Sequence, residues 1–164
     1  MDRIWAPWRT QYLSDVSKQK GCLFCRIGKA RNNSEDRVFL RSKHCYAVLN
    51  KYPYNNGHAL IVPYRHVSDL AKFSEEARRD FFDLLNEVKA LLDDVLHPEG
   101  YNIGMNMGHA AGAGVPKHIH MHIVPRWIGD VNFMPVVTQT KVISQSLDEL
   151  YKALIRADKA RRKG

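Results

Sequence analysis

His118-Ile119-His120-Met121-His122-Ile123-Val124-Pro125 is the stretch that decides the fold, because histidine and apolar residues alternate along it. In a β-strand, side chains two residues apart share a face, so three imidazoles roughly 6.5–7 Å apart are expected on one side. The apolar side chains are then expected on the other side, against a core. We therefore predict a strand over residues 118–124.

The three histidines indicate chemistry more than packing. Histidine has an unperturbed pKa near neutrality and serves as a nucleophile, a proton carrier or a metal ligand. The approach to the strand, Gly108–Gly114, is rich in glycine, which allows a backbone to come close to a phosphate. The alternatives are a row of partly exposed edge-strand histidines and a flexible connection that holds no ligand.

A second block lies upstream, where Leu49-Asn50-Lys51 is followed by Asn56-Gly57-His58-Ala59-Leu60-Ile61-Val62-Pro63 and then by Arg65-His66-Val67. In this order the two blocks resemble the histidine triad family of nucleotide hydrolases and transferases, over most of residues 38–127. A lone His-x-His-x-His would have suited a metal site equally well.

Length and composition predict one globular domain over residues 1–164, and the order of its expected helices and strands makes it an α+β domain. The chain has 45% hydrophobic and 26% charged residues, as ordinary soluble domains do. It has no apolar run of ~18 residues and no signal-peptide core at its start, so we expect a cytoplasmic protein without a membrane partner. Three cysteines, an odd number, favour a reduced compartment and a metal site over disulfides.

The formal charge of +8 is partly concentrated in residues 156–164. Lysine and arginine complement the negative pole of a helix C-terminus, so this run is most simply a solvated helix end. A nucleic-acid partner is the less favoured interpretation.

Two helices and five strands are expected. Ser74 reads as the N-cap of a long helix that ends at His97-Pro98, and a second helix is expected from about Ser146. Strands are expected near residues 38–40, 46–49, 59–62, 101–105 and 118–124. The family resemblance implies an antiparallel sheet of about five strands, and a homodimer.

The resemblance also assigns the site. It makes His120 the nucleophile, with His122 beside the phosphate as a donor, while Asn50 matches a ribose-contacting position. Val48 and Leu60 match positions that enclose the base, although ordinary strand-core packing explains them equally well. The remaining predicted substrate-binding residues are Asn106, Gly112, Gly114, Arg126 and Trp127.

Cys22 and Cys25 have the two-residue separation that lets two thiolates converge on one tetrahedral zinc. By resemblance to relatives with such a motif and to hexose-phosphate uridylyltransferases, His66 and His118 complete the site, which is then structural. The alternative is a pair of buried thiols, which is the interpretation preferred for Cys45. No organic cofactor is expected.

The branch of the family follows from residues outside the triad. The commoner hydrolase pattern has glutamine and then serine or threonine where this chain has Gly114 and Val115, and the missing glutamine opens space for phosphate to attack instead of water. Residues 5–13 and 125–133 resemble the bacterial diadenosine tetraphosphate phosphorylase branch, in which Arg126, Trp127 and the tryptophans at positions 5 and 8 would border a second nucleotide. The alternative is that these aromatic residues only seal the edge of the sheet.

We therefore expect cleavage of an adenine dinucleotide polyphosphate through a nucleotidyl-histidine, with inorganic phosphate as the acceptor and ADP and ATP as products from diadenosine tetraphosphate. The alternatives are a hydrolase of dinucleoside polyphosphates or nucleoside phosphoramidates, a zinc hydrolase with its metal on all three histidines, and a non-catalytic nucleotide-binding protein.

Overall fold

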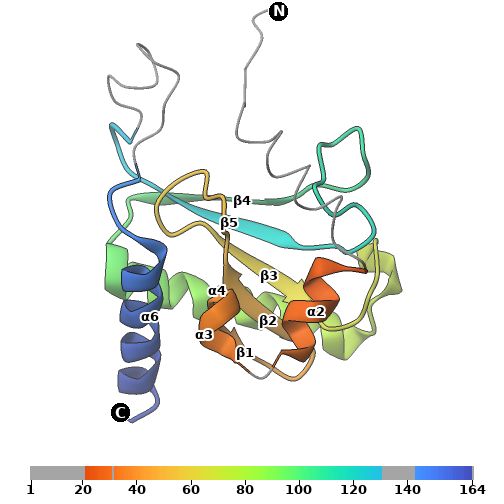
Figure 1. Cartoon of the computed structure of the whole chain (residues 1–164), viewed down its shortest axis with the longest axis horizontal. Coiled ribbons are helices and arrows are strands. Elements are labelled where there is room, and N and C mark those ends of the chain that lie inside the picture. The colour runs from red at the N-terminus through yellow and green to blue at the C-terminus, as the bar shows by residue number, and fades with distance from the viewer. Residues whose placement is uncertain (1–20, 31, 131–142, 164) are drawn as a thin grey trace, which may run out of the picture.

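The computed structural model describes residues 21–30, 32–130 and 143–163. Within them lies a five-stranded sheet of order β1-β2-β3-β5-β4, in which every neighbouring pair is antiparallel (Figure 1). The strands are β1 (Val38–Arg41), β2 (Cys45–Leu49), β3 (Ala59–Pro63), β4 (Gly100–Met105) and β5 (Met121–Arg126). The expected α+β class and antiparallel sheet are confirmed.

Helices cover both faces of the sheet (Figure 1). The long helix α4 (Glu75–Leu96) and the C-terminal helix α6 (Leu147–Arg161) pack on one face, over a core that includes Ile61 and Ile123. The short helix α2 (Leu23–Lys29) lies on the other face, over Tyr46 and Val48. Strands β2 and β3 are consequently buried along their whole length.

Both long helices begin where serine can cap them. The Ser74 side chain accepts a hydrogen bond from the backbone N–H of Ala77, and the Ser146 side chain accepts one from that of Glu149. Helix α4 ends at His97, whose positive φ of 47° places it in the left-handed region that terminates helices.

Three short elements were not predicted: α2, α3 (Asn33–Asp36) and the 3-10 turn η1 (Leu70–Lys72). Long-range contacts hold α2 in place, since the Arg41 guanidinium donates to the carbonyls of Gly28 and Ala30 at 3.1 Å each. Such contacts leave no periodic signal in a segment of seven residues.

The strand predicted over residues 118–124 begins at Met121 and continues to Arg126. Its pairing with β3 ends at Met121 opposite Ile61, because the backbone N–H of Ile119 leaves the ladder and donates to the Val67 carbonyl at 2.7 Å. The alternation nevertheless holds, since Ile119, Met121 and Ile123 all lie in the core beneath α4.

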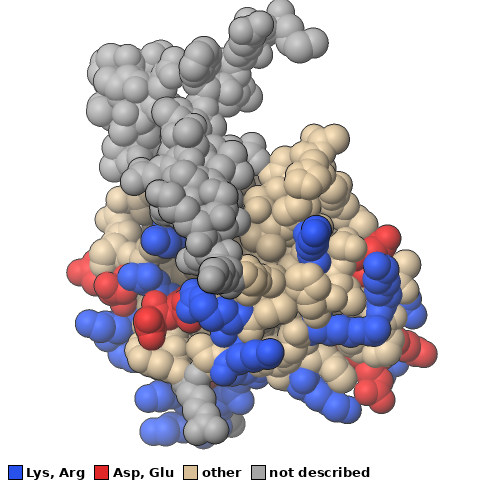
Figure 2. Space-filling model, turned by 45° about the vertical axis from the view of Figure 1, so that its right-hand side comes forward, with Lys and Arg blue, Asp and Glu red and all other residues tan. Residues whose placement is uncertain are grey.

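Basic side chains lie in several groups over the lower part of one face, with acidic side chains among them (Figure 2). In the C-terminal run, Arg161 pairs with Asp94 and Arg162 pairs with Asp158. Part of this charge is therefore neutralised within the fold. Among the residues placed by the structure, no helix is long and apolar enough to cross a membrane.

Candidate functional site

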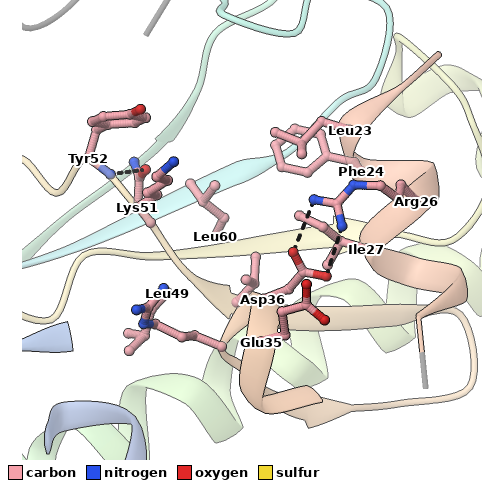
Figure 3. A pocket seen from close by; sticks show the side chains of 13 residues that line it. Leu23, Phe24, Arg26, Ile27, Glu35, Asp36, Leu49, Lys51, Tyr52 and Leu60 are labelled. Atoms are coloured by element: carbon pink, nitrogen blue, oxygen red, sulfur yellow. Dashed lines mark hydrogen bonds and ion pairs between the residues drawn. The ribbon is translucent and has the colours of Figure 1, made fainter. Parts of the chain in front are cut away.

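An apolar pocket of about 360 Å³ opens beside the sheet, between α2 and α3 on one side and the end of β2 on the other. Leu23, Phe24 and Ile27 of α2 face Lys51 and Tyr52 across it (Figure 3). Val48, Leu60 and Asn50 also line it. Its apolar walls and polar rim suit a planar base with a sugar attached.

A smaller hollow of about 50 Å³ adjoins this pocket, and His120 and His122 line it. The two cavities share part of their walls. The shared residues are Phe24, Asn50, Tyr52 and Leu60. The other residues of the smaller hollow are Tyr54, Asn106, Gly112, Gly114, His120 and His122. A ligand can therefore place a nucleoside in the first cavity and its phosphate in the second.

A backbone carbonyl fixes which nitrogen of His120 is available. Its Nδ1 lies 3.0 Å from the carbonyl oxygen of His118, and a carbonyl can only accept, so Nδ1 carries the proton and donates. In the neutral ring, Nε2 then holds the free electron pair. This is the arrangement that an attacking imidazole needs.

A chain of hydrogen bonds fixes His122 in the same way. The backbone N–H of Tyr54 donates to His58 Nδ1 at 3.0 Å, so the proton of His58 is on Nε2, which donates to His122 Nδ1 at 2.9 Å. The proton of His122 is then on Nε2, which is buried and has no hydrogen-bond partner in the part of the chain that the structure places. A buried donor without a partner is costly, so this N–H is ready for a ligand oxygen.

Burial keeps these rings neutral. Desolvation, followed by the neighbouring His122 and His120, lowers the pKa of His58 to about 3. Desolvation and then His120 lower the pKa of His122 to about 4, and desolvation also lowers the pKa of His120. At neutral pH all three are uncharged, as the hydrogen-bond chain requires.

His58 is the functional residue that sequence reasoning missed. It belongs to the quoted Asn56-Gly57-His58 block but received no role. It is 1% exposed, and a buried polar residue that opens an apolar strand is the signal that pointed to a partner. The Asn50 amide also lies 3.3 Å from its Nδ1.

We expect His58→Ala to lower kcat/KM about 10- to 100-fold, because His122 loses the donor that sets its tautomer. His58→Gln retains a group that can accept from Tyr54 and donate onward, so it should recover part of the loss. Steady-state kinetics with thermal unfolding would check this. A folded His58→Ala protein of wild-type activity would contradict the hydrogen-bond chain.

The glycine-rich segment borders the hollow through Gly112 and Gly114, but not every amide faces it. The N–H of Gly112 donates to the His109 carbonyl at 2.9 Å. This N–H therefore closes a turn and is not available to bind a phosphate. Asn106 lines the same hollow and can supply an amide donor.

Cys22, Cys25, His66 and His118 come together beside the triad, with their ligand atoms all within 4.8 Å of one another. His118 Nδ1 lies 3.2 Å from Cys22 Sγ and 3.6 Å from Cys25 Sγ, and His66 Nδ1 lies 3.3 Å from Cys25 Sγ. Tetrahedral zinc holds such ligands about 3.3–3.8 Å apart, so the donor set fits zinc.

The hydrogen bond on the far side of His118 also suits a metal ligand. Its Nε2 donates to the Pro63 carbonyl at 2.9 Å, which leaves the Nδ1 electron pair directed at the sulfurs. Because both nitrogens of His118 are engaged, Nδ1 by the sulfurs and Nε2 by the Pro63 carbonyl, this geometry disfavours a metal held by all three triad histidines.

Arg126 and Trp127 lie at the opposite end of β5 from the triad. Arg126 pairs with Asp130 and donates to Asn102, while the Trp127 indole N–H donates to the His97 carbonyl at 3.2 Å. They line neither of the two cavities described above. The tryptophans at positions 5 and 8 and the segment 131–133 fall outside the described residues.

Fold and site together define an enzyme of the histidine triad class that processes nucleotides, and comparison with known proteins agrees. Residues 31–127 match the HIT domain family, and the chain belongs to it. AP-4-A phosphorylase of Mycobacterium tuberculosis is 35% identical over 162 residues, which cover 94% of this chain and 83% of that protein.

Solved structures show the same fold. A Zn-bound histidine triad family protein from Mycobacterium smegmatis superposes with a TM-score of 0.70 at 25% identity, covering 87% of this chain and 96% of that one. Plasmodium falciparum diadenosine triphosphate hydrolase superposes with a TM-score of 0.66 over 92% and 98% of the two chains. At 20% identity, the second likeness bears on the fold alone.

Proposed function

We propose that this protein cleaves dinucleoside polyphosphates by nucleotidyl transfer through His120, and that diadenosine tetraphosphate and inorganic phosphate give ADP and ATP. The observation that carries the proposal is the His120 Nδ1 contact of 3.0 Å with the His118 carbonyl, which leaves Nε2 as a nucleophile in a hollow that adjoins a nucleoside-sized pocket. The similarity to AP-4-A phosphorylase supports the choice of substrate.

The first step forms a covalent intermediate. With one adenosine in the apolar pocket and its ribose near Asn50, the Nε2 electron pair of His120 attacks the α-phosphorus. The P–N bond forms as the P–O bond to the leaving ATP breaks, and the N–H of His122 donates to phosphate oxygen as negative charge builds there.

The second step releases ADP. An oxygen of inorganic phosphate attacks the same phosphorus, and the P–N bond to His120 breaks. Gly114 stands where the commoner hydrolase pattern has glutamine, which leaves room for an acceptor bulkier than water. Attack by water would release AMP instead.

Product identity tests the acceptor. We expect purified protein with diadenosine tetraphosphate and phosphate to yield ADP and ATP in equal amounts, as measured by ion-exchange chromatography. Replacing phosphate by sulfate, which is similar in size and shape, serves as the control. AMP with ATP in both reactions would contradict phosphorolysis and favour the hydrolase alternative.

We also infer that the cluster of Cys22, Cys25, His66 and His118 binds a structural zinc ion. A four-ligand site has no open position for substrate, so its part is to tie the segment after residue 21 to the triad. The similarity to a Zn-bound relative supports this assignment. The homodimer, the cytoplasmic location, the single domain over residues 1–164 and the absence of an organic cofactor stay predictions.

A further inference from the structure

The second half of a dinucleotide substrate needs a binding surface that the two cavities do not supply. The apolar pocket accommodates one nucleoside, and the hollow beside it accommodates a phosphate. The residues expected to border the second nucleotide, Arg126 and Trp127, are engaged with Asp130 and His97 at the far end of β5.

Tyr54 lies where the second half would emerge. It lines the histidine hollow but not the nucleoside pocket, so it stands on the side of the hollow away from the first nucleoside. Tyr54 is nevertheless one of the exposed large hydrophobic residues, with 46% of the residue accessible to solvent.

The two faces of this ring differ. One face covers the imidazoles, with ring centroids 4.5 Å from His58 and 5.8 Å from His122, and its plane is inclined by only 13° to that of His122. Since the imidazoles cover that face, the exposure belongs mainly to the opposite face and the ring edge. A flat aromatic surface next to a phosphate site is suited to stacking a base.

We propose that the outer face of Tyr54 stacks the base of the leaving nucleotide, and that this contact makes the protein prefer dinucleoside polyphosphates to mononucleotides. The inference rests on the proposed function, because it names the group that holds the second half of the same substrate. It assigns Tyr54 a role in specificity, separate from the chemistry at His120.

Binding measurements test the contact without turnover. Isothermal titration calorimetry would compare diadenosine tetraphosphate with adenosine 5′-tetraphosphate, which has the same phosphate chain but no second adenosine. The full-length His120→Ala protein prevents cleavage, and Tyr54→Ala and Tyr54→Phe are added to it. Tyr54→Phe is the matched control, because it removes the hydroxyl and keeps the ring.

For Tyr54→Ala we expect the ratio of the diadenosine dissociation constant to the adenosine tetraphosphate constant to rise roughly tenfold, within the range found for base–aromatic stacking. Tyr54→Phe should keep the ratio of the parent protein. An unchanged ratio in Tyr54→Ala would overturn the inference, and equal weakening of both ligands would show instead that the ring acts through His58 and His122. No measurable binding of diadenosine tetraphosphate to the parent would overturn it as well.

Failure of the proposed reaction is separately visible. The ratio of the two dissociation constants could depend on Tyr54 while the wild-type protein forms no nucleotide product. That result would refute the nucleotidyl transfer but would still support the stacking contact.

Discussion

Replacing His120 by alanine is expected to lower kcat on diadenosine tetraphosphate by at least about 10⁴-fold, which is the scale seen when an enzyme loses its nucleophile. The reason is geometric: Nδ1 of His120 lies 3.0 Å from the His118 carbonyl oxygen and donates to it, which leaves Nε2 free. Reactions quenched with denaturant at alkaline pH, where the P–N bond persists, and analysed by mass spectrometry should show an adenylylated peptide containing residue 120 in the wild type and none in the variant.

The control for this experiment is His44→Ala. His44 lies before β2 and lines neither cavity, and its Nε2 lies 3.5 Å from the Glu76 carboxylate. Its replacement removes an imidazole without touching the triad, so turnover and adduct should persist. Full turnover by His120→Ala, or an adduct on a different residue, would refute the assignment of the nucleophile.

The sheet could be predicted because its signals are local. Alternation of histidine with apolar residues, and the serine caps at positions 74 and 146, need only neighbouring residues to be interpreted. The start of β5 could not be placed, because the hydrogen bond that ends its pairing joins Ile119 to Val67, far away in the sequence.

The tautomers of the histidines also could not be predicted from the sequence. His120 takes its acceptor from the backbone of His118, and His122 takes its donor from His58, 64 residues earlier. The side-chain spacing indicates that imidazoles gather, but it cannot show which nitrogen faces which partner. His58 received no role because its importance lies in its hydrogen bond to His122, which the sequence does not show.

Some of the predicted substrate-binding residues line the two cavities, whereas others make structural contacts elsewhere in the fold. Asn50, Leu60 and the glycines at positions 112 and 114 lie around the histidine hollow, whereas Val48 lies in the adjoining pocket. Arg126 belongs to a motif whose internal contacts include an ion pair with Asp130. A sequence match alone does not distinguish residues that hold a turn from residues that touch a ligand.

Cys22→Ser is expected to lower the zinc content well below one ion per chain and to reduce the Tm by roughly 10 °C, because loss of a structural metal ranks among the largest single-residue effects on stability. Cys22 Sγ lies 3.2 Å from His118 Nδ1, so the substitution removes one of four converging donors. Atomic absorption on the purified protein and differential scanning calorimetry would measure both quantities.

Turnover should fall as well, because His118 joins the two sites. Its ring belongs to the metal cluster and its backbone carbonyl orients His120, so loss of the metal also disturbs the position of His120.

Cys45→Ala is the matched control, since that buried thiol packs in the core beneath α4. Its replacement should lower the stability a little and leave the zinc bound. A Cys22→Ser protein with wild-type zinc content and Tm would refute the site, and a chelated protein that keeps its Tm but loses all turnover would favour a catalytic metal over a structural one.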